Sequence, residues 1–195
     1  MYLKHLNILN YKNVSQVELD FCDGINCFVG ANGAGKTNLL DAVYYLSFCK
    51  SYFNSIDSQN ISHDEDFFVI QGTFDRNESE EQIYVALKRN QKKQFKRNKK
   101  EYSRLSEHIG LLPLVMISPS DERLIVEGSD QRRKYIDSVV SQYNKAYLEK
   151  IIRYNRALVQ RNTLLKKSVR LTDALDAQFD VWDEQMTLLG QKIFE

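Results

Sequence analysis

Apolar and polar residues alternate along four stretches in the first half of the chain. These stretches are residues 2–10, 17–21, 67–74 and 82–88. A period of two is typical of β-strands that bury one face and expose the other. The connections within the first pair and within the second pair are short, so we expect both pairs to run antiparallel.

Two other stretches, residues 25–29 and 111–117, are mostly apolar without alternation. A short apolar run bounded by turn residues is typical of a strand that is buried on both faces. After the first run, residues 38–47 change to helical spacing, and the predicted inner face consists of Leu39, Leu40, Val43 and Leu46. The pattern therefore predicts a strand, a loop and a helix between residues 25 and 47.

From Gly128 onward the sequence has helical spacing and contains no proline. Apolar residues recur at helical intervals from Ile136 to Leu165, and a last stripe consists of Trp182, Met186, Leu189 and Ile193. We therefore predict an α/β fold in two parts. Residues 1–127 form an α/β lobe with antiparallel strands in a mixed sheet, and residues 128–195 form a helical lobe.

The loop between the first apolar run and its helix carries the strongest chemical signal. Gly30 and Gly35 enclose four residues and are followed by Lys36 and Thr37, which is the P-loop pattern. Glycine lets the backbone approach a phosphate group closely, and a helix N-terminus adds partial positive charge. In this pattern the lysine reaches the β- and γ-phosphates and the hydroxyl ligates Mg²⁺. A glycine-rich turn that matches by chance would not explain the strand and the helix on either side.

The place of this loop in the chain separates classes of P-loop protein. Two predicted strands precede it, whereas the P-loop strand usually comes first in kinases and GTPases. An antiparallel start is more typical of ATPases of the ATP-binding cassette (ABC) type. The Asp-x-x-Gly and Asn-Lys-x-Asp motifs of GTPases do not occur. Another P-loop enzyme stays an alternative, as does a DNA-binding module whose P-loop is only structural.

The composition indicates the class of protein and the cellular compartment that we expect for it. Hydrophobic residues make up 43%, charged residues 27%, and the net charge is +1, as in ordinary soluble globular proteins. The 3 cysteines lack metal-ligand spacing, and an odd number argues against a disulfide framework, so we expect a cytoplasmic protein. No signal-peptide pattern or membrane-spanning run occurs, so we expect no membrane partner. We expect the polar residues 48–66, with Lys50, Ser51 and His63, to form a solvated loop.

Residues 88–100 carry the largest charge of a single sign in the chain, because eight of these thirteen residues are basic and none is acidic. One interpretation is a solvated hairpin whose lysines prevent pairing of a sheet edge with other chains. The other is a surface that holds the phosphate backbone of DNA without sequence specificity. Under the second interpretation the contact residues are Lys92, Lys93, Lys96 and Arg97.

Five motifs follow one another along the whole chain: Tyr11-Lys12-Asn13, residues 28–40 around the P-loop, residues 117–121, residues 128–137 and residues 160–166. Together they resemble the RecF family of bacterial DNA replication and repair proteins, which are ABC-type ATPases related to the SMC-like ATPases. The last two motifs are more specific to this family than the P-loop, which many ATPases share.

The resemblance implies an ATP-binding lobe and a helical lobe, with Mg²⁺ and ATP-dependent formation of a homodimer. It also implies binding to DNA and a role with RecO and RecR in loading RecA at single-strand gaps and stalled forks. Lys12 stands where the family usually has arginine near the nucleotide, which keeps the charge but loses a bidentate fork. The residues expected to bind the nucleotide are Gly30, Ala31, Asn32, Gly33, Ala34, Gly35, Lys36, Thr37, Asn38 and Lys12.

The resemblance also implies a signature motif and a Walker B strand that ends in two acids, and neither occurs in this sequence. Ser118, Pro119 and Ser120 separate the run 111–117 from Asp121 and Glu122, which puts these acids too far from the strand end to hold Mg²⁺ on the P-loop. We therefore expect the chain to correspond to the N-terminal half of a RecF protein. We expect it to contain no catalytic residue and to hydrolyse ATP poorly by itself.

Overall fold

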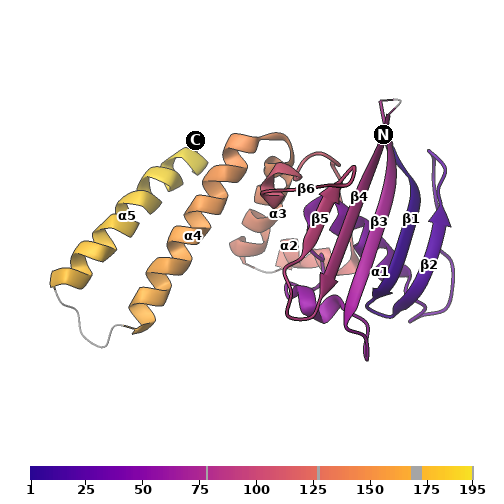
Figure 1. The fold of residues 1–195 in the computed structure, drawn as a ribbon. Helices are drawn as coiled ribbons and strands as arrows, with labels where there is room; N and C mark the ends of the chain where they lie inside the picture. The colour runs from indigo at the N-terminus through magenta and orange to yellow at the C-terminus, as the bar shows by residue number, and fades with distance from the viewer. Residues whose placement is uncertain (78, 127, 168–172, 195) are drawn as a thin grey trace. The chain divides into compact units, whose positions relative to one another are not determined.

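The computed structural model describes residues 1–77, 79–126, 128–167 and 173–194. It divides the chain into two compact units, Met1–Met116 and Ile117–Glu195. The first unit contains a β-sheet and one long helix, and the second contains helices (Figure 1). The change of composition at residue 128 predicted a later boundary than this division of the structure.

A six-stranded sheet forms the first unit, with strand order β2-β1-β3-β4-β5-β6. All its pairings are antiparallel, as predicted for the first and second pairs of strands. β6 is the edge strand of this sheet, so the end of the basic run lies at that edge. The strands are β1 (Tyr2–Tyr11), β2 (Val14–Asp20), β3 (Phe67–Arg76), β4 (Ser79–Lys88), β5 (Gln94–Arg97) and β6 (Lys100–Glu101).

The core of this unit lies between one face of the sheet and helix α1 (Lys36–Phe48) (Figure 1). Burial alternates along β3 and β4, as the period of two predicts. The central strand approaches the helix closely: a Cβ on Gly72 would lie 2.6 Å from Leu46 Cδ1. The fully buried apolar residues of this layer include Leu6, Ile8, Tyr45, Leu46, Phe68, Ile70, Ile83 and Val85.

Helix α1 buries most of the face that its apolar residues predicted, because Leu46 is fully buried and Leu39 and Val43 pack against the core. Leu40, assigned to the inner face, is 46% exposed, whereas Asp41 is fully buried. The reason is a hydrogen-bond network around the Asp41 carboxylate, described below, which turns this position inward. The helix and three of its four predicted inner residues are therefore confirmed, and Leu40 was assigned to the wrong face.

The two continuous apolar runs do not form strands. Residues 25–29 and 111–117 lie outside the sheet, and Ile25 and Val29 are 90% and 93% exposed. Cys27 is exposed as well. A strand buried on both faces needs neighbouring strands on both sides, and no described residue supplies one to these runs. The prediction of two buried strands is therefore wrong for this structure.

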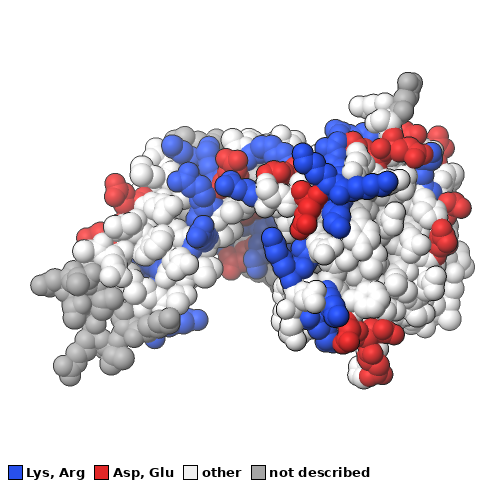
Figure 2. Space-filling model, viewed as in Figure 1, with Lys and Arg blue, Asp and Glu red and all other residues white. Residues whose placement is uncertain are grey.

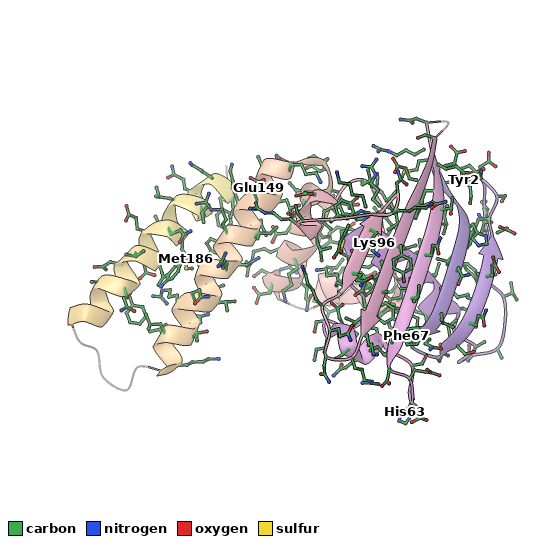
Figure 3. The ribbon with its side chains drawn as sticks, in the orientation of Figure 1. Tyr2, His63, Phe67, Lys96, Glu149 and Met186 are labelled. Carbon is green, nitrogen blue, oxygen red and sulfur yellow. The ribbon has the colours of Figure 1, made fainter. Side chains whose placement is uncertain are left out.

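The segment between α1 and β3 is more ordered than predicted. Ser51, which we expected in a solvated loop, is buried. A short 3₁₀ helix, η1 (Asp57–Asn60), follows, and Ile61 forms an isolated bridge to Tyr11. The segment thus packs along the end of β1, while His63 at its tip is exposed (Figure 3).

The second unit consists of a short α2 (Arg123–Val126), then α3 (Ser129–Tyr143), α4 (Lys145–Lys167) and α5 (Asp173–Phe194). Helices α4 and α5 pack against each other through buried residues that include Ala157, Phe179 and Leu189, and Met186 lies between them (Figure 3). Arg161 of α4 also forms an ion pair with Asp183 of α5. The predicted helical lobe and the stripe near its end are confirmed. No described helix is long and apolar enough to cross a membrane.

Candidate functional site

The glycine loop of residues 30–35 leads directly into α1. Gly35 is the N-cap residue of this helix and has a φ of 97°, in the left-handed region that residues with a side chain rarely adopt. Gly33 has a φ of 83°. Two left-handed glycines therefore shape the turn that brings the loop to the positive end of the helix.

The side chain of Lys36 folds back over the loop. Its ammonium group donates hydrogen bonds to the carbonyl oxygens of Gly30 at 2.7 Å and Ala31 at 2.8 Å. Inside the loop, the Ala34 N–H contacts the Ala31 carbonyl at 3.3 Å. The positive charge of Lys36 is therefore held at the loop itself, where a bound phosphate group would lie.

A pocket of about 230 Å³ opens at this loop, and polar or glycine residues line it. The chemistry of this lining suits a phosphate group better than an apolar ligand. The hydroxyl of Thr37 is the oxygen in the lining that suits Mg²⁺, since hard cations prefer oxygen ligands. The lining residues are Asn13, Asn32, Gly33, Gly35, Lys36, Thr37 and Asn38.

Asn13 belongs to this site, although the P-loop pattern does not include it. It lies in the turn between β1 and β2, and its amide contacts both the loop and the start of α1. Its Nδ2 donates to the Gly33 carbonyl at 2.8 Å, and its Oδ1 accepts from Asn38 Nδ2 at 2.6 Å. The sequence showed Asn13 only as the end of the Tyr11-Lys12-Asn13 motif.

A buried carboxylate lies one helical turn beyond the site. Asp41 Oδ2 accepts hydrogen bonds from the Tyr11 hydroxyl at 2.6 Å and from Ser51 Oγ at 2.7 Å, and Oδ1 accepts from the Tyr52 N–H at 2.7 Å. Burial, followed by the charge of Asp41, raises the pKa of Tyr11 well above its ordinary value, so Tyr11 stays a hydrogen-bond donor. This network anchors α1 to β1 and to the segment that follows α1. The pattern of apolar residues did not predict it.

Lys12 completes that network instead of lining the pocket. Its Nζ lies 2.6 Å from Asp41 Oδ2 and 3.3 Å from Ser51 Oγ, and only 15% of its side chain is exposed. Its charge also lies 5.4 Å from the centre of the Phe53 ring. A role for Lys12 at the nucleotide stays a prediction, and this structure assigns its ammonium group to Asp41.

The four basic residues predicted for DNA divide into two groups. Lys93 forms an ion pair with Asp57 at 2.6 Å and also donates to the Cys49 carbonyl at 2.7 Å. Arg97 forms an ion pair with the buried Glu81, and this hydrogen-bonded contact lowers the pKa of Glu81. Because both charges are neutralised within the chain, these two residues act first as structural groups of the sheet edge.

Lys92 and Lys96 belong to the other group, because no ion pair within the chain neutralises either among the described residues. Lys96 lies on the face of the sheet opposite α1, with its Nζ 5.5 Å from the centre of the Tyr84 ring (Figure 3). Basic side chains gather over β5 and β6 (Figure 2). A shallow groove of about 250 Å³ lies there, lined by Gln71, Gln82, Tyr84, Lys96 and Lys99.

The glycine loop that opens α1 beside an antiparallel sheet fits the ABC type of P-loop ATPase fold. The sequence model of the AAA ATPase domain family matches residues 1–193. The chain therefore belongs to the AAA ATPase domain family.

Several curated proteins similar in sequence to this chain are named as RecF proteins. The "DNA replication and repair protein RecF" of Bacteroides fragilis is 60% identical over 195 residues, which are 100% of this chain and 52% of that protein. A structure described as "the recombination mediator protein RecF-ATP in RecFOR pathway" has a TM-score of 0.88 and 33% identity, over 99% of this chain and 52% of that one. The chain thus spans about half the length of the curated relatives it matches.

A more distant likeness extends to the SMC ATPases. A structure described under "ATP-driven dimerization and DNA stimulated activation of SMC ATPases" has a TM-score of 0.55 and 23% identity, and covers 71% of this chain and 99% of that one. At this identity the likeness concerns the fold alone. It agrees with the fold class that the P-loop and the antiparallel start predicted.

Proposed function

We propose that this chain binds ATP with Mg²⁺ at the loop of residues 30–38. The observation that carries the proposal is the Lys36 ammonium group held over the loop at the N-terminus of α1. The loop N–H groups and Lys36 bind the phosphates, and Thr37 binds the metal ion. The similarity to a RecF structure described with ATP supports this nucleotide over others.

We propose that this chain supplies binding groups for the nucleotide but no acid that activates water. Asp41 is the nearest acid of α1, and its oxygens already accept hydrogen bonds from four donors. A carboxylate whose oxygens are already occupied by hydrogen bonds is not available to bind Mg²⁺ or to accept a proton from water. We therefore expect ATP binding without efficient hydrolysis by this chain alone.

For the whole protein we propose the role that the names of its relatives indicate, in DNA replication and repair. It would form an ATP-dependent homodimer in the cytoplasm, bind DNA without sequence specificity and act in the SOS response. With RecO and RecR it would help to load RecA at gaps and stalled forks. The support for this larger role is similarity in sequence and fold, since the chain spans about half of these relatives.

Titration calorimetry of the 195-residue chain with ATP, GTP and Mg²⁺ tests the nucleotide proposal. We expect ATP to bind and Lys36→Ala to weaken it at least about tenfold, because charge-assisted hydrogen bonds to the phosphates are lost. Lys50→Ala is the matched control, since Lys50 is exposed outside the loop. Binding of GTP without ATP would favour another class of P-loop enzyme, and equal affinity in Lys36→Ala would exclude the loop as the site.

We also propose that Lys92 and Lys96 contact the phosphate backbone of DNA. Replacing both with Ala should weaken binding to a duplex and flatten the dependence of log K on log salt by about 2, near one for each lost contact. Lys93→Ala is the control: it should lower the melting temperature, because it breaks the Asp57 pair, and leave the salt slope nearly unchanged. An unchanged slope in the double variant would remove this edge of the sheet from the DNA surface.

A further inference from the structure

The β1–β2 turn places an amide side chain against the phosphate loop from outside the loop's own sequence. We propose that Asn13 is a positioning residue for nucleotide binding, which holds the loop in its binding shape by joining it to the first turn of α1. The inference rests on the proposed binding of ATP at this loop. It concerns a residue that lies 17 positions before Gly30 in the sequence and outside the P-loop pattern.

The two hydrogen bonds of Asn13 fix the direction of its amide. The Gly33 carbonyl can only accept, so the Asn13 group at 2.8 Å from it must be the NH₂. The carbonyl oxygen of the same amide then faces Asn38 and accepts from its Nδ2 at 2.6 Å. One side chain thus spans from the loop to the helix, and each of its polar ends has a suitable partner.

The sheet, not the loop, determines where Asn13 lies. Its turn contains two residues between the paired Tyr11 and Val14, and Tyr11 is fully buried with its hydroxyl on Asp41. A side chain carried by a short turn between two strands is held more firmly than one carried by a long loop. Asn13 therefore transfers the rigidity of the sheet to the glycine loop.

Gly35 shows how closely the turn and the loop approach each other. A Cβ on Gly35 would lie 3.0 Å from Asn13 Oδ1 and 3.4 Å from Val14 Cγ2. A side chain at this position would push against Asn13 and Val14, in addition to the strain of the φ of 97°. The P-loop pattern explains Gly35 by the ligand alone, whereas the structure adds the β1–β2 turn as a second reason.

The hydrogen bond from Asn13 to the Gly33 carbonyl suits the chemistry of a phosphate loop. The N–H groups must face the ligand, so the carbonyl groups need donors elsewhere. Asn13 supplies such a donor to Gly33. Gly33 has a φ of 83°, and a glycine can adopt many other backbone conformations. Without this hydrogen bond the loop would become ordered only when the nucleotide binds. The conformational entropy lost in that step would reduce the affinity for the nucleotide.

Two measurements on Asn13→Ala test the proposal. In the protein without nucleotide, amide hydrogen exchange across residues 30–40 should become at least about threefold faster while the β3 and β4 segments stay unchanged. In calorimetry with Mg²⁺, the affinity for ATP should fall about tenfold, the size expected for one or two lost hydrogen bonds. Asn7→Ala, a change of the same type on β1, should alter neither.

Two further variants separate positioning from general destabilisation. Asn13→Asp keeps the acceptor for Asn38 but loses the donor to Gly33, so its affinity for ATP should fall at least as far as that of Asn13→Ala. If Asn13 and Asn38 act as a unit, the double change to Ala should speed hydrogen exchange across residues 30–40, without nucleotide, little more than Asn13→Ala alone. Unchanged exchange in the loop of Asn13→Ala would overturn the proposal, as would full affinity in Asn13→Asp. If the unchanged chain binds no ATP, the proposed function fails, and the exchange data still decide whether Asn13 holds the loop.

Discussion

Ile70 and Ile25 are the same residue type in two regions that this fold treats in opposite ways. Ile70 lies in β3, pairs with Ile8 and Val85 on its two sides, and is fully buried under α1. Ile25 lies in the apolar run before the P-loop and is 90% exposed. Ile25 lies in a run that was predicted to be a buried strand, so its exposure does not follow from its local sequence.

The difference lies in where the partners of each region are encoded. Every strand of the antiparallel sheet finds its neighbours between residues 2 and 101, mostly across short turns. The runs 25–29 and 111–117 find no neighbouring strand among the described residues, although Leu112 of the second run is buried against α1. An apolar run therefore indicates that a segment tends to be buried. Whether it is buried depends on packing partners that are encoded elsewhere in the sequence.

Truncating the two isoleucines tests this comparison most strongly. Ile70→Ala should lower the free energy of unfolding of the first unit by about 4 kcal/mol, because it leaves a cavity between sheet and helix. Ile25→Ala should change it by less than about 0.5 kcal/mol, as for other exposed positions. Urea unfolding followed by near-ultraviolet circular dichroism of the tyrosines measures both.

A built-in control comes from Trp182, the only tryptophan of the chain, which lies in α5. Its fluorescence reports on the helical unit and should give the same midpoint in both isoleucine variants. Similar losses of stability in Ile70→Ala and Ile25→Ala would mean that residues 25–29 are covered in solution, and the comparison would fail.

Asp41 lies where the two regions meet, because α1 begins at the loop and packs on the sheet. Asp41→Ala should lower the free energy of unfolding by about 3 kcal/mol, since Lys12 and three other donors lose their acceptor in a buried place. The same urea experiment measures the loss. Asp23→Ala, an exposed acid in the turn before residue 25, is the control and should be near neutral. A neutral Asp41→Ala would show that the network does not hold the helix.

The smallest expected effect concerns the far side of the sheet. His5 Nδ1 lies 2.8 Å from Asp20 and its Nε2 lies 3.0 Å from Glu18, and the hydrogen bond to Asp20 raises the pKa of His5 above its ordinary value of 6.5. Since the folded state binds the proton more tightly, its stabilisation is complete below pH 6.5 and is lost as the pH rises through the raised value.

Melting temperatures of the chain and of His5→Asn between pH 5.5 and 8.5 check this sign. We expect a small advantage of the unchanged protein at the acidic end, which disappears toward the alkaline end. The effect is small because Asp20 and Glu18 are largely exposed and water screens such pairs. An advantage that grows with pH would contradict the assignment.

The sequence predicted the parts of the fold that depend on local patterns. Alternation predicted β1 to β4, helical spacing predicted α1 and the second unit, and glycine spacing predicted the loop that opens α1. Contacts between distant polar groups were not predicted, because a pattern of apolar residues carries no information about them. Asn13 on Gly33, Asp41 under Tyr11 and the buried Ser51 are of this kind. Lys93 and Arg97 illustrate the same limit, since a basic run does not show which charges have acids beside them.

The exposed run at residues 25–29 has a consequence for handling the protein in solution. This short apolar segment lies outside the described sheet, and its exposed residues Ile25, Cys27 and Val29 are available for contact with a neighbouring molecule. At high concentration such segments pair between chains and lead to aggregation. We expect light scattering of the chain to rise with concentration, and Val29→Lys to suppress that rise without lowering the melting temperature. Solubility, more than folding, is then the property that this stretch of sequence controls.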